Sequence, residues 1–167
     1  FDVDKWSSSV SGSSFYFNDY AEEEEIHHLD GQTIEEAEHQ IATRLYQNNA
    51  RVHFNQHIEK SGRFGKRIIY GGYIISLARA ISCNGLANTF KLAAIHSGKH
   101  SAPTFAGDTI YAWSKILEKE IIHKNVGAMM IRTLASKNDS KMNFPDKTNL
   151  TDNIVLDLEY SVLIPIK

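Results

Sequence analysis

The chain has 167 residues, of which 42% are hydrophobic, and a formal net charge of -2. This length provides one substantial core and is short for two, so we expect one domain over residues 1–167, with residues 1–20 as an N-terminal lead-in. The charge balance gives no basic field, and no run reaches the ~18 apolar residues of a membrane span, so neither nucleic acid nor a membrane is expected as a partner.

The N-terminal part predicts a lead-in, a strand entrance and a helix. The lead-in is rich in serine and aromatic residues without periodicity, and we expect its aromatic side chains to dock on the core. The acidic run 22–25 precedes an apolar segment, which favours a solvated strand entrance over a recognition tail. Thr33 and Glu36 have the spacing of a capping box, and hydrophobic residues follow on one helical face, so a helix is predicted over 33–47. The residues of this face are Ile34, Ala37, Ile41 and Leu45.

The middle of the chain predicts a loop followed by a buried helix. Residues 48–65 are polar and aromatic with glycine breakers, which is typical of an extended functional loop, here with a short helix near 56–61. Gly71 and Gly72 then open the most apolar run of the chain, which predicts a largely buried helix over 73–83 that ends at the following Asn-Gly pair.

The single cysteine, Cys83, lies in this apolar run and has no partner for an internal disulfide. We therefore expect a buried, inert thiol. A reducing, cytoplasmic location fits this cysteine usage best.

The C-terminal half predicts strands, because β-branched and aromatic residues are frequent in four long runs. These runs are 90–96, 109–122, 126–136 and 154–164. A turn at 103–108 and a polar excursion at 138–152 separate them. One buried helix followed by long antiparallel strands is the pattern of an α+β hotdog fold, an antiparallel sheet wrapped around a long central helix.

Two segments, NNARVHFN at 48–55 and RFGKRIIYG at 63–71, carry a family resemblance. Their order and spacing resemble the MaoC hydratase motif, Asp-x-Asn-Pro-Ile-His-x-Asp followed by Gly-Phe-Gly-x-Arg-Ile-x-His-Gly. Further segments make the chain similar, over nearly all its length, to the C-terminal half of the mesaconyl-CoA hydratases (β-methylmalyl-CoA dehydratases). They are ATRLYQN at 42–48, RIIYGG at 67–72, ISLARA at 75–80, NGLAN at 84–88 and FAGDTIYAWS at 105–114.

The resemblance implies a single MaoC-like hotdog domain whose sheet packs against another hotdog. We therefore expect a homodimer or pairing with a separately encoded first half, because a monomer would leave a sheet face or edge exposed. The substrate implied is an acyl-CoA thioester. Coenzyme A enters only as part of that substrate, and no other cofactor is expected.

In MaoC-type hydratases the motif's Asp and His activate a water molecule or, in reverse, take the α-proton and protonate the leaving hydroxyl. His53 falls on the catalytic His, and a neutral imidazole can serve at cytosolic pH. The Asp falls on Asn48, whose amide cannot accept a proton as a carboxylate does. Two outcomes stay open: His53 is the sole acid/base with Asn48 positioning water, or this half is chemically retired and the working pair lies in a partner half.

Gly71 falls on the glycine that begins the family's central helix, whose N–H points at the thioester carbonyl. A helix N-terminus presents unsatisfied N–H groups and a positive dipole end, which suit an enolate as it develops. Alternatively, Gly71 and Gly72 only permit close packing or an unusual backbone angle. Tyr70 replaces the family's usual His and lines the substrate pocket or fills it.

Other kinds of site have weaker support. His53 and His57 have helical metal-ligand spacing, but there is no Cys cluster or His-Glu-x-x-His pattern, so no metal is expected. The glycines lack the spacing of a dinucleotide fingerprint. A basic cluster consists of Lys60, Arg63, Lys66 and Arg67. These side chains either bind the phosphates of coenzyme A at the mouth of a pocket or are ordinary surface charges.

The function predicted first is a hydro-lyase that adds water to, or removes it from, a short 2-enoyl-CoA thioester, branched or dicarboxylic like mesaconyl-CoA. The alternative is a non-catalytic hotdog subunit, or an acyl-CoA-binding half, that needs a separate catalytic half. A second alternative is an acyl-CoA thioesterase, which the same scaffold also hosts.

Overall fold

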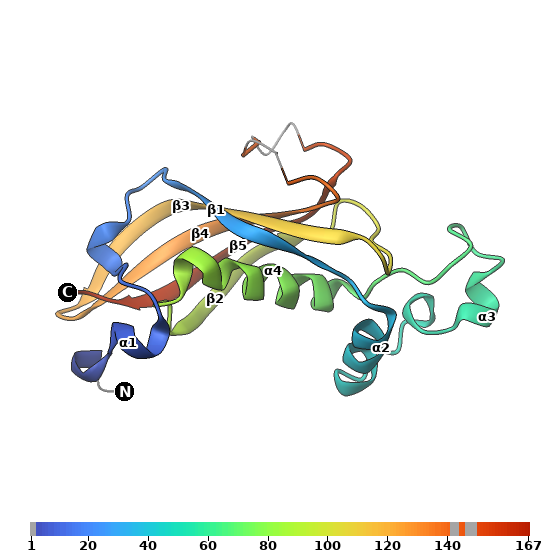
Figure 1. Cartoon of the computed structure of the whole chain (residues 1–167), viewed down its shortest axis with the longest axis horizontal. Helices are drawn as coiled ribbons and strands as arrows, with labels where there is room; N and C mark the ends of the chain where they lie inside the picture. Colours follow the sequence, from blue (N-terminus) through green and yellow to red (C-terminus); the bar gives the residue numbers. More distant parts are fainter. Residues whose placement is uncertain (1–2, 141–143, 146–149) are drawn as a thin grey trace.

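The computed structural model describes residues 3–140, 144–145 and 150–167. Five antiparallel strands form one sheet in the order β1-β3-β4-β5-β2. The sheet curves along one long helix, α4, as the hotdog arrangement requires (Figure 1). The elements are β1 (Glu25–Thr33), α4 (Gly71–Leu86), β2 (Lys91–Lys99), β3 (Thr109–His123), β4 (Val126–Lys137) and β5 (Ile154–Pro165).

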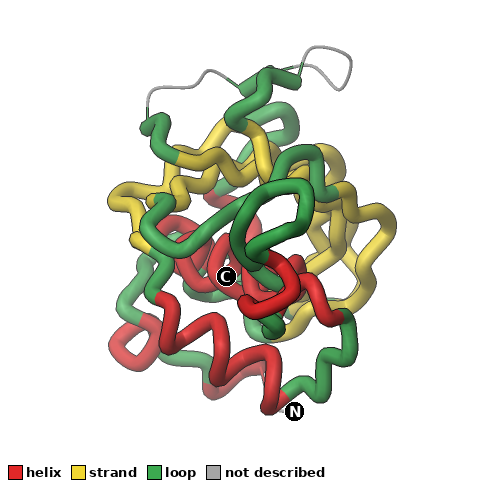
Figure 2. Tube along the Cα trace, turned by 90° about the vertical axis from the view of Figure 1, so that its right-hand side faces the viewer, coloured by secondary structure: helices red, strands yellow, loops and turns green. Residues whose placement is uncertain are grey.

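The remaining helices are short and lie in two groups. One group belongs to the N-terminal lead-in, and the other extends beyond the end of the sheet, near the start of α4 (Figure 1). The first comprises η1 (Val3–Lys5), α1 (Ser8–Ser11) and η2 (Phe17–Asp19); the second comprises α2 (Glu36–Leu45), η3 (Arg51–His53) and α3 (Gln56–Glu59). The predicted loop with a short helix is thus confirmed. In the end-on view the strands arch over the helical segments (Figure 2).

The core lies between α4 and the concave face of the sheet. One face of α4 is buried, at the spacing expected for an amphipathic helix, and consists of Ile74, Leu77, Ala78, Ser82 and Leu86. The helical backbone is interrupted at Asn84 and at Gly85, where φ is 110°. Only glycine adopts that angle without strain, so the Asn-Gly pair ends the regular helix where the sequence predicts.

A buried chain of hydrogen bonds runs beneath α4 and determines the tautomer of His28. Its Nδ1 lies 2.6 Å from the carbonyl oxygen of Asn84, which can only accept, so Nδ1 carries the proton. The other ring nitrogen then accepts from the hydroxyl of Ser114 at 2.7 Å. Ser114 in turn accepts from Thr133, which accepts from Tyr160. The chain therefore holds His28 neutral, and burial lowers its pKa to about 4.

The lead-in docks on the core through aromatic side chains, as predicted. Tyr16, Phe17 and Tyr20 are buried, whereas Phe15 is exposed. The ring of Phe17 lies so close to Gly127 of β4 that a Cβ atom there would be 2.1 Å from it. Glycine at this position therefore makes room for the lead-in.

The start of helix α2 was predicted wrongly. Thr33 ends strand β1, and its hydroxyl lies 2.8 Å from that of Thr109 on β3. Helix α2 begins at Glu36 without a side-chain cap. The cross-strand pairing of β1 with β3 thus takes the residue that would have capped the helix.

The predicted apolar face of α2 and the predicted burial of Cys83 also need correction. Ile41 and Leu45 are 56% and 73% exposed, because α2 lies beyond the end of the sheet. Cys83 is exposed on α4, where Ser82 takes the buried position. Of the polar excursion at 138–152, residues 141–143 and 146–149 lie outside the described residues.

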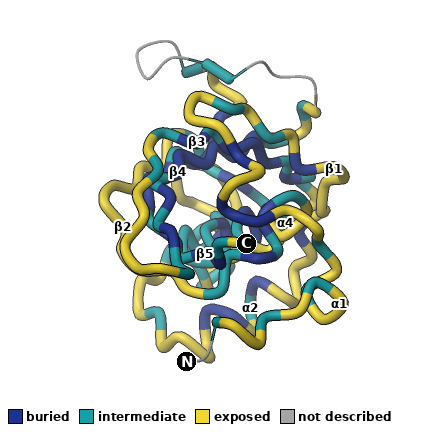
Figure 3. Tube along the Cα trace, turned by 90° about the vertical axis from the view of Figure 1, so that its left-hand side faces the viewer, coloured by how far each residue is buried: buried dark blue, intermediate teal, exposed yellow. Residues whose placement is uncertain are grey.

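The strands of the sheet differ in how far their residues are buried. All nine residues of β2 are exposed, while β4 is largely buried and β3 is buried only in its first half (Figure 3). In the described part of the chain, no helix is long and apolar enough to cross a membrane.

Candidate active site

The N-terminus of α4 forms the centre of the candidate site. Tyr70 is the N-cap residue with extended backbone angles, and no side chain caps the helix there. Gly71 and Gly72 therefore begin the first turn, where N–H groups have no acceptor within the helix. This end carries the positive pole of the helix dipole, which favours a developing negative charge.

Both glycines permit close packing at the start of α4, while the predicted role of the Gly71 N–H at a thioester carbonyl stays a prediction. A Cβ atom on Gly71 would lie 2.6 Å from Nε2 of His100, and one on Gly72 would lie 2.5 Å from the ring of Tyr70. Neither glycine has a positive φ angle, so an unusual backbone angle is not the reason for glycine here. Glycine instead allows two side chains to approach the helix start.

His53 lies beside this helix end on η3. Its Nδ1 is 3.1 Å from the carbonyl oxygen of Ile68, so Nδ1 donates and Nε2 of the neutral ring has a free lone pair. The His53 ring packs edge-on to the Tyr70 ring, with centroids 5.7 Å apart. The geometry gives His53 an available base next to Tyr70 and Gly71, while its catalytic role stays a prediction.

His39 of α2 also belongs to this site and was missed in the sequence. Its side chain is 1% exposed, and its Nε2 accepts the backbone N–H of Tyr70 at 2.9 Å. Burial lowers the pKa of His39 to about 4, with a smaller effect from His53, whose ring centroid is 6.4 Å away. A neutral His39 thus anchors the residue that caps α4. The signal that could have found it is its i, i+3, i+4 spacing with Ala42 and Thr43, which are buried on the same face of α2.

His100, just beyond β2, is the second residue missed. Its ring reaches the start of α4 at Gly71. Burial lowers the pKa of His100, partly opposed by a hydrogen bond to the backbone of Val155. A neutral imidazole therefore faces the helix end at neutral pH. No sequence pattern connects His100 with the motif residues, because His100 and Gly71 meet only in the folded chain.

The side chain of Asn48 is held by the local backbone. Its Oδ1 accepts the N–H of Ala50 at 2.9 Å, which closes a local turn. No hydrogen bond joins it to His53 in the described structure. The structure thus brings His53, Tyr70 and the two glycines together, whereas the Asn48 side chain lines a polar cavity with other residues.

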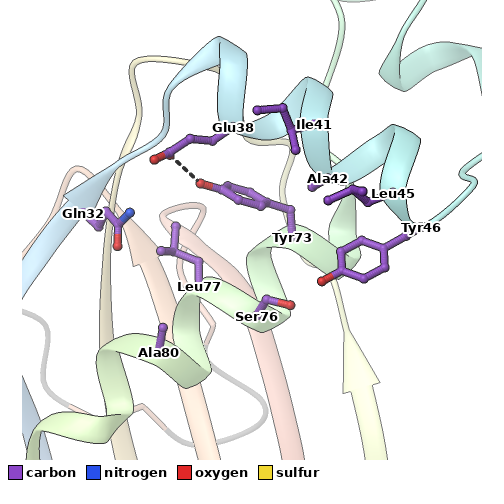
Figure 4. Close-up of a pocket in the computed structure, with 10 residues that line it drawn as sticks. All are labelled: Gln32, Glu38, Ile41, Ala42, Leu45, Tyr46, Tyr73, Ser76, Leu77 and Ala80. Carbon is purple, nitrogen blue, oxygen red and sulfur yellow. Dashed lines mark hydrogen bonds between the residues drawn. The ribbon is translucent and has the colours of Figure 1, made fainter.

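An apolar groove of about 410 Å³ lies between α2 and α4, close to the same helix end (Figure 4). The side chain of Tyr73 lies across it and donates a hydrogen bond to Oε2 of Glu38 at 2.8 Å. Burial and this hydrogen bond raise the pKa of Tyr73 to about 12. Exposed apolar side chains of α2 and of its C-cap residue line the groove, namely Ile41, Leu45 and Tyr46.

The predicted basic cluster divides into different environments. The Arg67 guanidinium forms an ion pair with Glu36. Lys66 lies 4.2 Å from the ring centroid of Phe105, and the guanidinium of Arg63 lies over the ring of Phe64. A shared phosphate site for the cluster stays a prediction. Within the described ranges, no group of three or more metal-ligating side chains occurs.

Comparisons with known proteins show what the chain is similar to. It is 56% identical over 160 residues to beta-methylmalyl-CoA dehydratase of Chloroflexus aurantiacus, covering 93% of this chain and 46% of the relative. It is 44% identical over 163 residues to mesaconyl-CoA hydratase of Cereibacter sphaeroides, covering 94% of this chain and again 46% of the relative. The chain thus spans about half the length of the curated relatives it matches. No family model matches it.

Solved structures give the same result. A MaoC domain protein from Chloroflexus aurantiacus aligns with a TM-score of 0.94 and 52% identity, over all of this chain and 49% of that one. A double-hotdog protein from Mycobacterium tuberculosis aligns with a TM-score of 0.68 and 24% identity, over 96% of this chain and 45% of that one, which shows the fold alone.

The fold is therefore a hotdog fold of the MaoC-like type. As the motif resemblance predicts, the chain is similar over nearly all its length to about half of beta-methylmalyl-CoA dehydratase, of mesaconyl-CoA hydratase and of a solved MaoC domain protein. A match to about half of each relative is consistent with the predicted C-terminal half.

Proposed function

We propose that this chain supplies one hotdog half of an acyl-CoA hydratase/dehydratase that acts on a 2-enoyl-CoA thioester resembling mesaconyl-CoA. The observation that carries the proposal is the free start of α4 at Gly71, with the available Nε2 of His53 beside it. The names of the two relatives support the substrate class. Coenzyme A enters with the substrate, no other cofactor is proposed, and the location proposed is the cytoplasm.

The proposed reaction uses two features of the site. The Gly71 N–H donates to the thioester carbonyl oxygen and stabilises the enolate that forms when water adds. Nε2 of His53 takes a proton from the water as the water oxygen bonds to the β carbon, and the protonated His53 then returns that proton to the α carbon of the enolate. Dehydration reverses these steps. Asn48, held by Ala50, cannot replace the missing carboxylate as a base.

A second candidate function has its own observation in favour. Asn48 stands where the motif has its carboxylate, and its side chain closes a turn instead of contacting His53. In this candidate the chain completes the fold and the substrate pocket, while a partner half performs the chemistry.

Both candidates include pairing with a second hotdog domain, either another copy or a first-half protein. Among the described residues, strand β2 pairs only with β5, so its outer edge exposes backbone hydrogen-bonding groups along an exposed strand. Leu92 and Ile95 on this strand are 45% and 55% exposed. An edge of this length and apolar content favours association with another sheet.

The enzymatic test is hydration of mesaconyl-CoA and crotonyl-CoA, followed by loss of the enoyl absorbance. We expect His53→Ala to reduce kcat/KM by at least roughly 100-fold, the usual contribution of a general base. His57→Ala is the matched control, because His57 is exposed on α3 four residues away. Full activity of His53→Ala rejects the catalytic proposal, and activity that appears only with a first-half protein and survives His53→Ala supports the second candidate.

The association test is light scattering at micromolar concentration. We expect a dimer or a complex with a first-half protein, and we expect Ile95→Lys to weaken it by placing a charge on the β2 edge. A stable monomer that also fails to bind any first half contradicts the pairing.

A further inference from the structure

A second cavity, of about 480 Å³, lies between α2 and the loop that carries His53. Seven side chains line it, and none is a carboxylate: Gln40, Thr43, Arg44, Gln47, Asn48, Phe54 and Arg67. Two of the seven are arginines. A cavity with two guanidinium groups and amide donors has the chemistry of an anion site.

The two arginines differ in how they are held. Arg67 pairs with Glu36, and its NH1 donates to the carbonyl oxygen of Phe54 at 3.4 Å. Its Nε is buried and has no hydrogen-bond acceptor. Arg44 is exposed, and no carboxylate of the described residues lies within ion-pair distance of it. Among the described residues Arg44 therefore has no counter-charge and is accessible to an anion, while the buried Nε of Arg67 has no acceptor, which is costly unless a ligand supplies one.

Asn48 explains why this cavity is cationic. Its Oδ1 is occupied by the N–H of Ala50, which leaves its NH₂ group as a further donor. The MaoC motif has Asp at this position, and an aspartate there would place the chain's own negative charge among the arginines. The amide removes that charge, so Arg44 remains available for an external anion, and Arg67 has the single carboxylate partner Glu36 among the described residues.

The cavity is linked directly to the candidate catalytic residue. Phe54 lines it and follows His53 in the chain, and Gln40 lines it and donates to the carbonyl oxygen of His53 at 3.0 Å. In a mesaconyl-type thioester the free carboxylate is attached to the carbon that receives water. The site for that carboxylate must therefore lie next to the residue that activates the water.

We propose that the cavity lined by Arg44, Asn48 and Arg67 binds the free carboxylate of a dicarboxylic enoyl-CoA and selects it over an uncharged enoyl-CoA. This inference rests on the proposed function, because it assigns the substrate class of the same site. The replacement of the motif's Asp by Asn48 then serves the recognition of this carboxylate. The other source of the same anionic chemistry is a phosphate of coenzyme A.

The test compares mesaconyl-CoA with crotonyl-CoA, which lacks the carboxylate, using the protein in its native assembly. We expect Arg44→Gln to lower the ratio of the two kcat/KM values by roughly 10- to 100-fold, the effect of losing a charge-assisted hydrogen bond. Asn48→Asp is expected to lower the ratio in the same direction. Arg51→Gln is the matched control, since this arginine is 62% exposed and lies outside the cavity.

The outcomes distinguish a site for the free carboxylate from a site for a coenzyme A phosphate, and they test the anion site separately from the proposed function. An equal loss for both thioesters, with weaker binding of free coenzyme A, assigns the cavity to a phosphate and overturns the carboxylate proposal. An unchanged ratio in both variants also overturns it. Calorimetry distinguishes failure of this inference from failure of the proposed function. If the protein turns over neither thioester but binds mesaconyl-CoA more tightly than crotonyl-CoA, and Arg44→Gln removes this preference, the anion site is retained and the enzyme activity is rejected.

Discussion

Lowering the pH from 7 to 4.5 is expected to destabilise the protein through His28, which the buried hydrogen-bond chain keeps neutral. The folded pKa of His28 is about 4, against an ordinary value of about 6.5. Between these values the unfolded chain binds a proton that the folded chain does not. The free energy of unfolding therefore falls as the pH is lowered through this window, and it is highest above the unfolded pKa.

The magnitude follows from the two pKa values. One proton linked to unfolding gives a slope of about 1.4 kcal/mol per pH unit within the window. Across the full window of about 2.5 units, His28 alone costs on the order of 3 kcal/mol. This is a large share of the ~5–15 kcal/mol by which folded domains are usually stable.

The assay is urea denaturation at pH 7, 6, 5 and 4.5 in the parent and in His28→Gln, whose amide offers a donor and an acceptor but does not titrate here. The variant is expected to be less stable at pH 7, yet its stability should depend on pH less steeply by about 1.4 kcal/mol per unit. His123→Gln is the control, because this histidine is exposed on the β3–β4 turn. Equal slopes in parent and His28→Gln would refute the reasoning.

Three further predictions concern packing and exposure. Gly127→Ala should cost about 1–3 kcal/mol in urea denaturation, because its Cβ would meet the Phe17 ring, and an unchanged midpoint would show that the ring moves freely. Gly71→Ala should cost a similar amount, and His100→Ala in the same chain should recover most of it; purely additive losses would contradict the contact. Cys83 should react with a thiol reagent in the native chain, whereas reaction only after unfolding would mean that a partner covers α4.

Much of the fold could be predicted because local patterns and tertiary structure agree. The apolar spacing of α4, the Asn-Gly pair that ends it and the β-branched runs of the strands all require the same arrangement. The start of α2 could not be predicted, since the pairing of Thr33 with β3 depends on a strand distant in the sequence. The exposure of Ile41 and Leu45 could not be predicted either, because apolar residues occur both in cores and at interfaces.

The candidate site was predictable only where the motif is continuous. Residues 48–72 supply His53, Tyr70 and the two glycines, which the structure brings together. His39 and His100 lie on elements before and after this stretch, and only folding places them at the start of α4. The Asn48 side chain is held in a local turn that residue spacing does not reveal.

The most direct test of the proposed site is the structure of the native assembly with methylsuccinyl-CoA, a saturated thioester that has no double bond to hydrate. We predict that the thioester carbonyl oxygen lies about 3 Å from the backbone N–H of Gly71. We also predict that the free carboxylate lies at Arg44. A thioester bound only in a partner half, with the start of α4 in this chain unoccupied, would contradict the proposed function.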